Sequence, residues 1–350
     1  MRKLLCGLTG ILLGLAAPAA VAGQAPDTDY DLLIEDIALR PGVTVDVHVR
    51  VYVDETRPCQ GQTLFAVHGF AHTSAAWGPL AEALFAGASG EAGVVCRVAA
   101  VDLPARGGSS PPTGILFGDL LLADYVTALE GTLDGLEAGG VHPGTIVGHS
   151  QGGLLVQMLQ QRLLDDGTSL LLRYGIHHAL LLASAPPAGI PWNFVDSGTA
   201  GAILGQLIVF DPVLGLVARV PDALFPILFF TDTNGDLVSG APTPADVAAK
   251  GWNGPEPLLA ALNLVGAPPL AREVIDPGIF GLGSGIRLSM VSYQEDVLIR
   301  PSENAVLFEH LTGRAPDRDF VEVTGLEAVH DVQLSAPQLI LDALGGPLRF

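Results

Sequence analysis

A glycine-rich turn between a strand and a helix is the feature that most constrains the fold. Residues 148–152 read Gly-His-Ser-Gln-Gly, which is a Gly-x-Ser-x-Gly pattern that occurs once in the chain. The β-branched run at residues 145–147 predicts a strand before the turn, and residues 154–164 predict a helix after it. A serine on so sharp a turn needs small neighbours, because other backbone must pass close to it. We therefore expect Ser150 to stand exposed at the end of a strand.

The rest of the chain alternates between strand-like and helical patterns. Residues 32–37 and 43–53 predict two strands, and the second alternates valine with polar residues like a half-exposed antiparallel edge. Further strands are expected at residues 64–67, 98–101, 145–147, 179–182, 287–293 and 319–323, and helices at residues 75–85, 117–136, 154–164, 303–311 and 336–344. This alternation predicts an α/β fold, with a mostly parallel sheet and helices on both of its faces.

The alternation stops between residues 188 and 283, where prolines, glycines and apolar residues dominate. An interruption followed by resumption indicates an inserted, mainly helical cap at residues 188–283, between two core segments at residues 23–187 and 284–350. The apolar run at residues 213–230 is interrupted by Arg219 and Asp222. We therefore interpret it as helices whose apolar face lines a pocket, not as a membrane span.

The N-terminus has the three parts of a secretory signal. Two basic residues at positions 2 and 3 precede an apolar run at residues 4–17, and Ala20-Val21-Ala22 follows. We expect residues 1–22 to be a signal peptide cleaved after Ala22, so that the mature protein is periplasmic or extracellular. The alternative is an uncleaved membrane anchor, since the segment carries no charge after residue 3.

Cys59 and Cys96 would then lie in an oxidising compartment. Each precedes an apolar strand, and strands that follow one another through a helix are usually parallel and close, so their starts can meet. We predict a disulfide between Cys59 and Cys96. Two buried free thiols are the alternative.

The charge balance argues against a nucleic-acid partner. The chain has 37 acidic and 17 basic residues and a net charge of -20, and it contains no basic run that could neutralise phosphates. We interpret the acidity as a soluble surface. The sequence does not indicate the oligomeric state.

Ser150 needs a base, and the base needs an acid that orients it, because a serine hydroxyl is a poor nucleophile at neutral pH. His330 follows the last predicted strand, and Asp296 follows the strand before that, so both fall at the carboxyl edge of the sheet with Ser150. Glu295 is the alternative to Asp296. The other histidines are interpreted as structural, among them His68, His72, His149, His177, His178 and His310.

Together these segments resemble the α/β-hydrolase family, and within it the capped esterases and lipases. The resemblance rests on His-Gly-Phe at residues 68–70, Asp-Leu-Pro-Ala-Arg-Gly at residues 102–107, the turn at residues 148–152, and the segments of Asp296 and His330. It implies Ser150 as nucleophile, His330 as general base and Asp296 as its orienting acid. It further implies that the backbone N–H groups of Phe70 and Gln151 form the oxyanion hole. Ala105-Arg106-Gly107 departs from the Gly-His-Gly of most relatives, and we interpret this loop as structural.

The resemblance leads us to expect an exported serine hydrolase. It would cleave carboxylic esters with apolar acyl or aromatic groups through an acyl-enzyme, and it would need no metal or organic cofactor. The partner would be a small-molecule ester or a lipid, and transient contact of the cap with a lipid interface is left open. Relatives with an aspartate nucleophile, such as epoxide hydrolases, are excluded by Ser150. Alternatives are a peptidase, amidase or thioesterase on the same residues, and a catalytically silent binding protein.

A short acidic loop at residues 232–236, Asp-Thr-Asn-Gly-Asp, resembles a calcium-binding loop. The glycine expected at the sixth position is Leu237, and no glutamate closes the loop. We therefore predict a turn at these residues and no metal site.

Overall fold

The computed structural model describes residues 29–54, 62–87 and 95–344. The predicted signal peptide with its cleavage site at Ala22 lies outside these ranges, as does Cys59. Within the described ranges, none of the helices combines the length and the apolar character that crossing a membrane requires.

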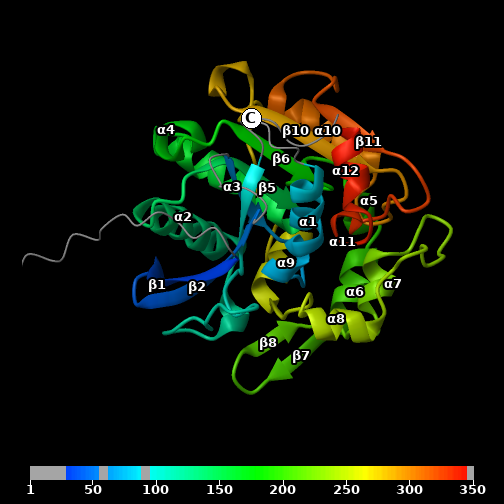
Figure 1. Cartoon of the computed structure of the whole chain (residues 1–350). Helices are drawn as coiled ribbons and strands as arrows, with labels where there is room; N and C mark the ends of the chain where they lie inside the picture. The colour runs from blue at the N-terminus through cyan, green and yellow to red at the C-terminus, as the bar shows by residue number, and fades with distance from the viewer. Residues whose placement is uncertain (1–28, 55–61, 88–94, 345–350) are drawn as a thin grey trace, which may run out of the picture.

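The centre of the molecule is an eight-stranded sheet with the strand order β1-β2-β4-β3-β5-β6-β10-β11 (Figure 1). The strands are β1 (Tyr30–Arg40), β2 (Val43–Val53), β3 (Gln62–Val67), β4 (Val95–Val101), β5 (Pro143–His149), β6 (His178–Leu182), β10 (Arg287–Tyr293) and β11 (Phe320–Val323). β2 pairs antiparallel with β1 and β4, and the neighbours from β4 to β11 pair in parallel. The expected mostly parallel α/β sheet is confirmed.

β2 shows how the sequence pattern determines the burial of a strand. Its valines at alternate positions are buried, and the residues between them are half-buried. This follows from the two-residue repeat of a strand, which sends successive side chains to opposite faces. We expected β2 to be the edge strand of the sheet. This was wrong, because β1 pairs with the outer side of β2 and is itself the edge strand.

Helices cover both faces of the sheet (Figure 1). One face carries α1 (Gly78–Gly87) and α12 (Pro337–Ala343), and the other carries α2 (Leu122–Ala138), α3 (Gln151–Asp165) and α10 (Pro301–Thr312). Shorter elements are η1 (Ser74–Trp77), η2 (Phe117–Asp119), α4 (Leu170–Tyr174), α11 (Val332–Ser335) and η3 (Leu282–Ser284), which lies at the end of the inserted segment.

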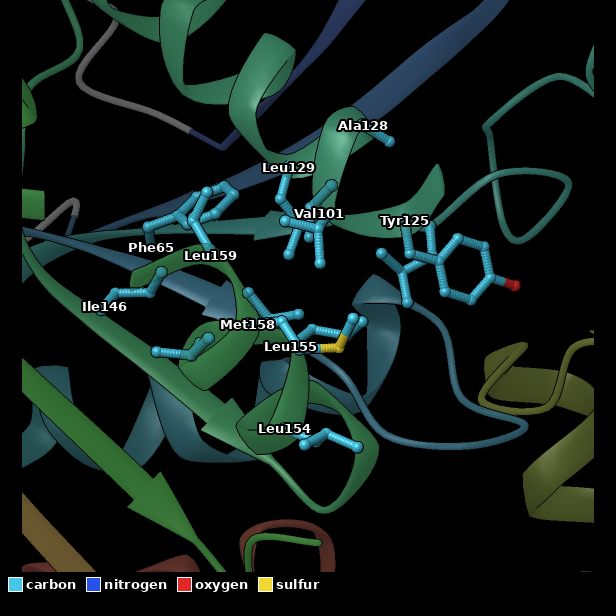
Figure 2. Packing of buried hydrophobic residues seen from close by; sticks show 14 of the residues in the cluster. Phe65, Val101, Tyr125, Ala128, Leu129, Ile146, Leu154, Leu155, Met158 and Leu159 are labelled. Atoms are coloured by element: carbon cyan, nitrogen blue, oxygen red, sulfur yellow. The ribbon is translucent and has the colours of Figure 1, made fainter. Parts of the chain in front are cut away.

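The central strands divide their side chains between two hydrophobic clusters. In β3, Phe65 and Val67 pack under α2 and α3, whereas Leu64 and Ala66 pack under α1 and α12. Figure 2 shows the first cluster, in which side chains of α2 and α3 meet those of the strands. A fully buried side chain such as Leu155 stabilises the fold by about 1.5–3 kcal/mol. Strands buried on both faces explain why their sequences are continuously apolar.

The segment at residues 188–283, which we call the cap, follows β6 and precedes β10 in the sequence. Most of it packs together at one side of the sheet (Figure 1). Its helices are α5 (Asn193–Asp196), α6 (Thr199–Leu207), α7 (Phe225–Phe229), α8 (Pro244–Lys250) and α9 (Leu258–Val265). Its small antiparallel sheet comprises β7 (Ile208–Asp211), β8 (Gly215–Ala218) and β9 (Glu256–Pro257).

The β7–β8 hairpin corrects the interpretation of residues 213–230 as helices, because β8 (Gly215–Ala218) lies within that run. Asp211 starts the hairpin turn, because its Oδ1 accepts hydrogen bonds from the N–H groups of Val213 and Leu214 at 2.9 and 3.0 Å. Gly215 follows with a φ of 84° that favours glycine. An aspartate before a proline is a turn signal, and the surrounding apolar run hid it.

The predicted disulfide falls partly outside the described residues. β3 and β4 are parallel neighbours whose first residues, Gln62 and Val95, lie opposite one another. Cys96 is buried near the start of β4. Because Cys59 is not described, its pairing with Cys96 stays a prediction.

The start of α3 lies against the backbone of β3, with no space for a side chain. A Cβ atom added to Gly152 would lie 2.2 Å from the carbonyl oxygen of Val67, and one added to Gly148 would lie 2.5 Å from that of Gly152. The two glycines of the Gly-x-Ser-x-Gly pattern are therefore required by packing between backbones.

We predict that Gly152→Ala lowers the free energy of unfolding by about 1–3 kcal/mol or more, because backbone atoms must move apart. Gly201→Ala is the matched control. It lies in α6 with no atom within 4 Å of the added Cβ, so it should raise stability by up to about 1 kcal/mol. Urea denaturation of both variants measures the difference, and equal stabilities would contradict the packing argument.

Candidate active site

Ser150 occupies a strained turn between β5 and α3. Its φ of 52° and ψ of -119° lie where residues other than glycine are rare, at a cost of about 1–3 kcal/mol. The backbone is fixed on both sides: Ser150 N donates to Leu182 O, and Ala185 N donates to Ser150 O, both at 3.0 Å. The side chain is partly exposed at the carboxyl edge of the sheet.

His330 and Asp296 form a buried pair beside this turn. His330 lies in the loop after β11 and Asp296 in the loop after β10, the strand beside it. His330 Nδ1 donates to Asp296 Oδ2 at 2.8 Å. Asp296 Oδ1 accepts hydrogen bonds from the N–H groups of Leu298 and Ile299 at 2.8 and 2.9 Å. Both oxygens of the carboxylate are therefore occupied, and the tautomer with Nδ1 protonated leaves His330 Nε2 free to accept a proton.

The carboxylate also determines the protonation of His330. Burial by itself lowers the pKa of the imidazole, because charge is costly away from water. The Asp296 charge, its hydrogen bond and the Asp331 charge together outweigh burial and raise the pKa above its ordinary value of 6.5. The imidazolium is thus stabilised where it would form.

Ser150 and His330 both line one cavity. In the described part of the chain, no hydrogen bond of 3.5 Å or less joins the Ser150 hydroxyl to a neighbour. The three predicted residues lie at one edge of the sheet. Of the two contacts expected among them, the hydrogen bond between Asp296 and His330 is formed. Hydrogen bonds to a nucleophile are often long in a structure without substrate.

The two predicted oxyanion donors flank Ser150. The loop after β3 passes against it, since a Cβ on Gly69 would lie 3.1 Å from Ser150 Cβ, and Phe70 lines the same cavity. Gln151 is the first residue of α3, where N–H groups lack partners within the helix and the helix dipole favours negative charge. Among the described residues, neither backbone N–H has an acceptor.

A second buried histidine network supports the His330 loop. His72 Nε2 donates to Asp331 Oδ2 at 2.7 Å, and His149 Nε2 donates to the carbonyl oxygen of His330 at 3.0 Å. Burial, followed by the charge of His330, lowers the pKa of His149 to about 3. We predicted that His149 and His72 are structural. In the structure, both bond to the loop that carries His330 and hold it in place. Asp331 was missed, although its position next to His330 was a usable signal.

Within the described residues, one cluster of side chains has ligand atoms close enough together to hold a metal ion, and it lies in this network. The ligand atoms of His149, His330 and Asp331 lie within 4.8 Å of one another. His149 and Asp331 already bond to protein partners, and His330 bonds to Asp296. We therefore assign these atoms to the hydrogen-bond network and not to a metal site.

Glu295, the alternative acid, faces the cap. Its Oε2 accepts a hydrogen bond from the Thr233 hydroxyl, in the acidic loop of the cap. That loop is a turn in which the N–H groups of Asn234 and Asp236 both donate to Asp232 Oδ1 at 2.9 Å. Asp296, not Glu295, is the acid that contacts His330.

The cavity above Ser150 is apolar and is built largely by the cap. Its volume is about 80 Å³, which is smaller than the roughly 300–1,000 Å³ of typical small-molecule sites. The cap contributes the aromatic residues Trp192, Phe194 and Phe229, and the Phe229 ring stacks on the His330 imidazole with centroids 6.0 Å apart. Apart from Ser150 and His330, the lining side chains are apolar. Lining from α6, α7 and α9 is Ala200, Ile203, Leu204, Leu207, Leu228, Ala261, Leu264 and Val265.

The parallel sheet and this strand–turn–helix site define an α/β hydrolase. Residues 64–343 match the alpha/beta hydrolase family, which is most of the chain, and the protein belongs to that family. A search of curated proteins by sequence returned no significant match.

Solved structures of the same fold are similar at low sequence identity. A bromoperoxidase from Bacillus anthracis superposes with a TM-score of 0.57 at 14% identity, covering 90% of this chain and 98% of that one. Naproxen esterase from Bacillus subtilis has a TM-score of 0.51 at 15% identity, covering 90% of each chain. Epoxide hydrolase A from Mycobacterium thermoresistibile has a TM-score of 0.52 at 15% identity, covering 92% and 100%. These likenesses show the fold alone, so the activity must be argued from the site.

We predict that the imidazole of His330 titrates with a midpoint above pH 6.5, and that Asp296→Asn lowers this midpoint. The substitution removes the charge that stabilises the imidazolium but leaves the burial that opposes it. Proton NMR titration measures the midpoint, and a His330→Gln spectrum identifies the resonance. An unchanged midpoint in Asp296→Asn would contradict the electrostatic argument.

Proposed function

We propose that the protein is an exported serine hydrolase that cleaves carboxylic esters with apolar acyl or aromatic groups. The observation that carries the proposal is the 2.8 Å hydrogen bond from His330 Nδ1 to Asp296 beside a cavity that Ser150 and His330 share. A nucleophile, a base and an acid in this arrangement perform acyl transfer on several unrelated folds. The export part rests on the sequence of residues 1–22.

In the first half of the reaction, Ser150 Oγ attacks the ester carbonyl carbon while His330 Nε2 takes the hydroxyl proton. Negative charge develops on the carbonyl oxygen, where the N–H groups of Phe70 and Gln151 receive it. Each such donor contributes about a hundredfold or more in rate. The intermediate then collapses, His330 gives its proton to the leaving alcohol, and the acyl group stays on Ser150.

In the second half, water attacks the acyl carbon and His330 takes its proton in the same way. The acid product leaves and Ser150 recovers its hydrogen. Asp296 stays ionised throughout and stabilises the imidazolium in both halves. Because only neutral His330 can accept a proton, turnover requires a pH above its raised pKa.

The cavity lining supports the apolar preference. With no charged side chain among its lining residues except His330, it favours neutral chains and aromatic groups over charged ones. Amides and thioesters can react by the same steps, so a peptidase, amidase or thioesterase is the alternative. The same residues argue against a silent binding protein, because such a protein would not need an oriented Asp296–His330 pair.

We predict that Ser150→Ala lowers ester kcat by about 10⁴-fold or more and abolishes covalent labelling by a fluorophosphonate. Ser197→Ala, in an exposed part of the cap, is the control and should keep both. Hydrolysis of para-nitrophenyl butyrate and intact-protein mass spectrometry are the measurements. Wild-type turnover in Ser150→Ala, or a label on another residue, would disprove the assignment.

We predict that kcat/KM for para-nitrophenyl esters rises from acetate through longer acyl chains. Each buried methylene contributes about 0.8 kcal/mol, which is about fourfold in kcat/KM. Emulsified triglyceride, tested alongside, shows whether the preference extends to a lipid interface. Equal rates for all chain lengths would contradict the apolar acyl site.

Ile203→Trp should reverse this rise, because Ile203 lines the cavity and a larger ring would fill it. Ile227→Trp is the matched control. It makes the same change at an exposed position in the cap that does not line the cavity. The control should keep the chain-length profile of the parent protein.

A further inference from the structure

The cap places one carboxylate in the core of the molecule. Glu256, in β9, is 0% exposed. Its Oε2 pairs with the guanidinium of Arg106, which follows β4, and its Oε1 accepts a hydrogen bond from Gln151 Nε2 at 2.9 Å. One cap residue thus contacts two segments of the core, and both lead to a proposed oxyanion donor.

The first connection runs through Arg106 to Phe70. Arg106 Nη1 donates to the carbonyl oxygen of Gly69 at 3.1 Å, and His68 Nδ1 donates to the same oxygen at 2.9 Å. The Gly69 carbonyl and the Phe70 N–H belong to one planar trans peptide unit, in which they point in opposite directions. Two donors that fix this oxygen therefore fix the direction of the Phe70 N–H and increase its polarity.

The second connection runs directly to Gln151. Its side chain is fully buried, and its amide group is bonded to Glu256. The same residue supplies the other oxyanion donor through its backbone N–H. A side chain fixed at its far end restricts the rotation of the first turn of α3, and so restricts where that N–H points.

The backbone around Glu256 shows that cap and loop dock together. Thr73 N donates to Trp252 O at 3.1 Å, and Gly254 N donates to Ala71 O at 2.9 Å. The cap segment that leads to Glu256 therefore runs beside the loop that carries Phe70. Arg106 is 1% exposed, and a buried guanidinium is unfavourable without a countercharge. Arg106 therefore needs the carboxylate of Glu256.

We propose that Glu256 is a positioning residue that aligns both oxyanion donors, so that the hole is complete only when the cap is docked. The inference rests on the proposed serine hydrolase function. It assigns a role to a residue that touches neither substrate nor the reacting atoms. It also gives Arg106 a role beyond that of a structural loop residue.

The test compares kcat, KM and inhibitor binding in Glu256→Gln. The substitution removes the charge that holds Arg106 but keeps a side chain of the same size. We expect kcat to fall about tenfold or more, with KM within about twofold of the parent, because the donors act on the transition state. Affinity for an alkyl trifluoromethyl ketone, which forms an oxyanion on Ser150, should fall by the same factor. Affinity for an alkyl alcohol of equal chain length should not change.

Glu303→Gln is the matched control. Glu303 is a buried glutamate at a different cap–core contact, where its Oε1 accepts a hydrogen bond from Asn193 N at 2.6 Å. The control should keep kcat and ketone affinity within about twofold of the parent. If Glu256→Gln does not fold, Gln151→Met removes one connection and preserves both the backbone N–H and the Arg106 ion pair. It should lower kcat several-fold with KM unchanged.

The outcomes separate this inference from the proposed function. A parent protein that reacts with a fluorophosphonate, together with a Glu256→Gln variant of unchanged kcat, overturns the inference alone. The same holds if kcat, KM and alcohol binding all change together, since that indicates loss of the cavity and not of donor alignment. A parent protein that does not react overturns the proposed function and the inference with it.

Discussion

The close contact between the start of α3 and the backbone of β3 is the constraint on which the site depends. It allows the chain to reverse at Ser150 within one residue, in a conformation that residues other than glycine rarely adopt. The strain is local, and it is compensated by hydrogen bonds from Ser150 to the end of β6 and by the buried faces of α3. A rigid sheet below and a helix dipole beside the turn then place a hydroxyl where charge can develop.

Around this turn, polar groups are arranged in two buried networks. One joins His330, Asp296, His72, His149 and Asp331, and it holds an imidazole ready to accept a proton. The other joins Glu256, Arg106 and Gln151, the residue after Ser150. Buried polar groups are costly unless they have partners. The positions of both networks at the cap–core junction indicate that they serve the site more than the stability of the fold.

Much of the core could be predicted from the sequence because its signals are local. The strands and the turn could be predicted from short stretches: the alternating valines of β2, the apolar strands and the Gly-x-Ser-x-Gly pattern. The carboxyl edge of a parallel sheet then brings Ser150, Asp296 and His330 together. The cap could not be predicted in the same way, since its apolar run at residues 213–230 has no clear period and concealed the second strand of a hairpin. The pair of Arg106 and Glu256 was invisible because the partners are 150 residues apart and Glu256 belongs to no motif.

The apolar lining of the cavity has a consequence for the end of the proposed reaction. In that reaction an ester would enter as a neutral molecule, but its acyl half would leave as a carboxylate. Among the lining residues there is no arginine or lysine that could compensate this charge, and an anion in such surroundings is strongly disfavoured. The proposed hydrolysis would thus convert a neutral substrate that suits the cavity into an anion that is poorly solvated there. The acid would then leave towards water and free the cavity for the next turnover.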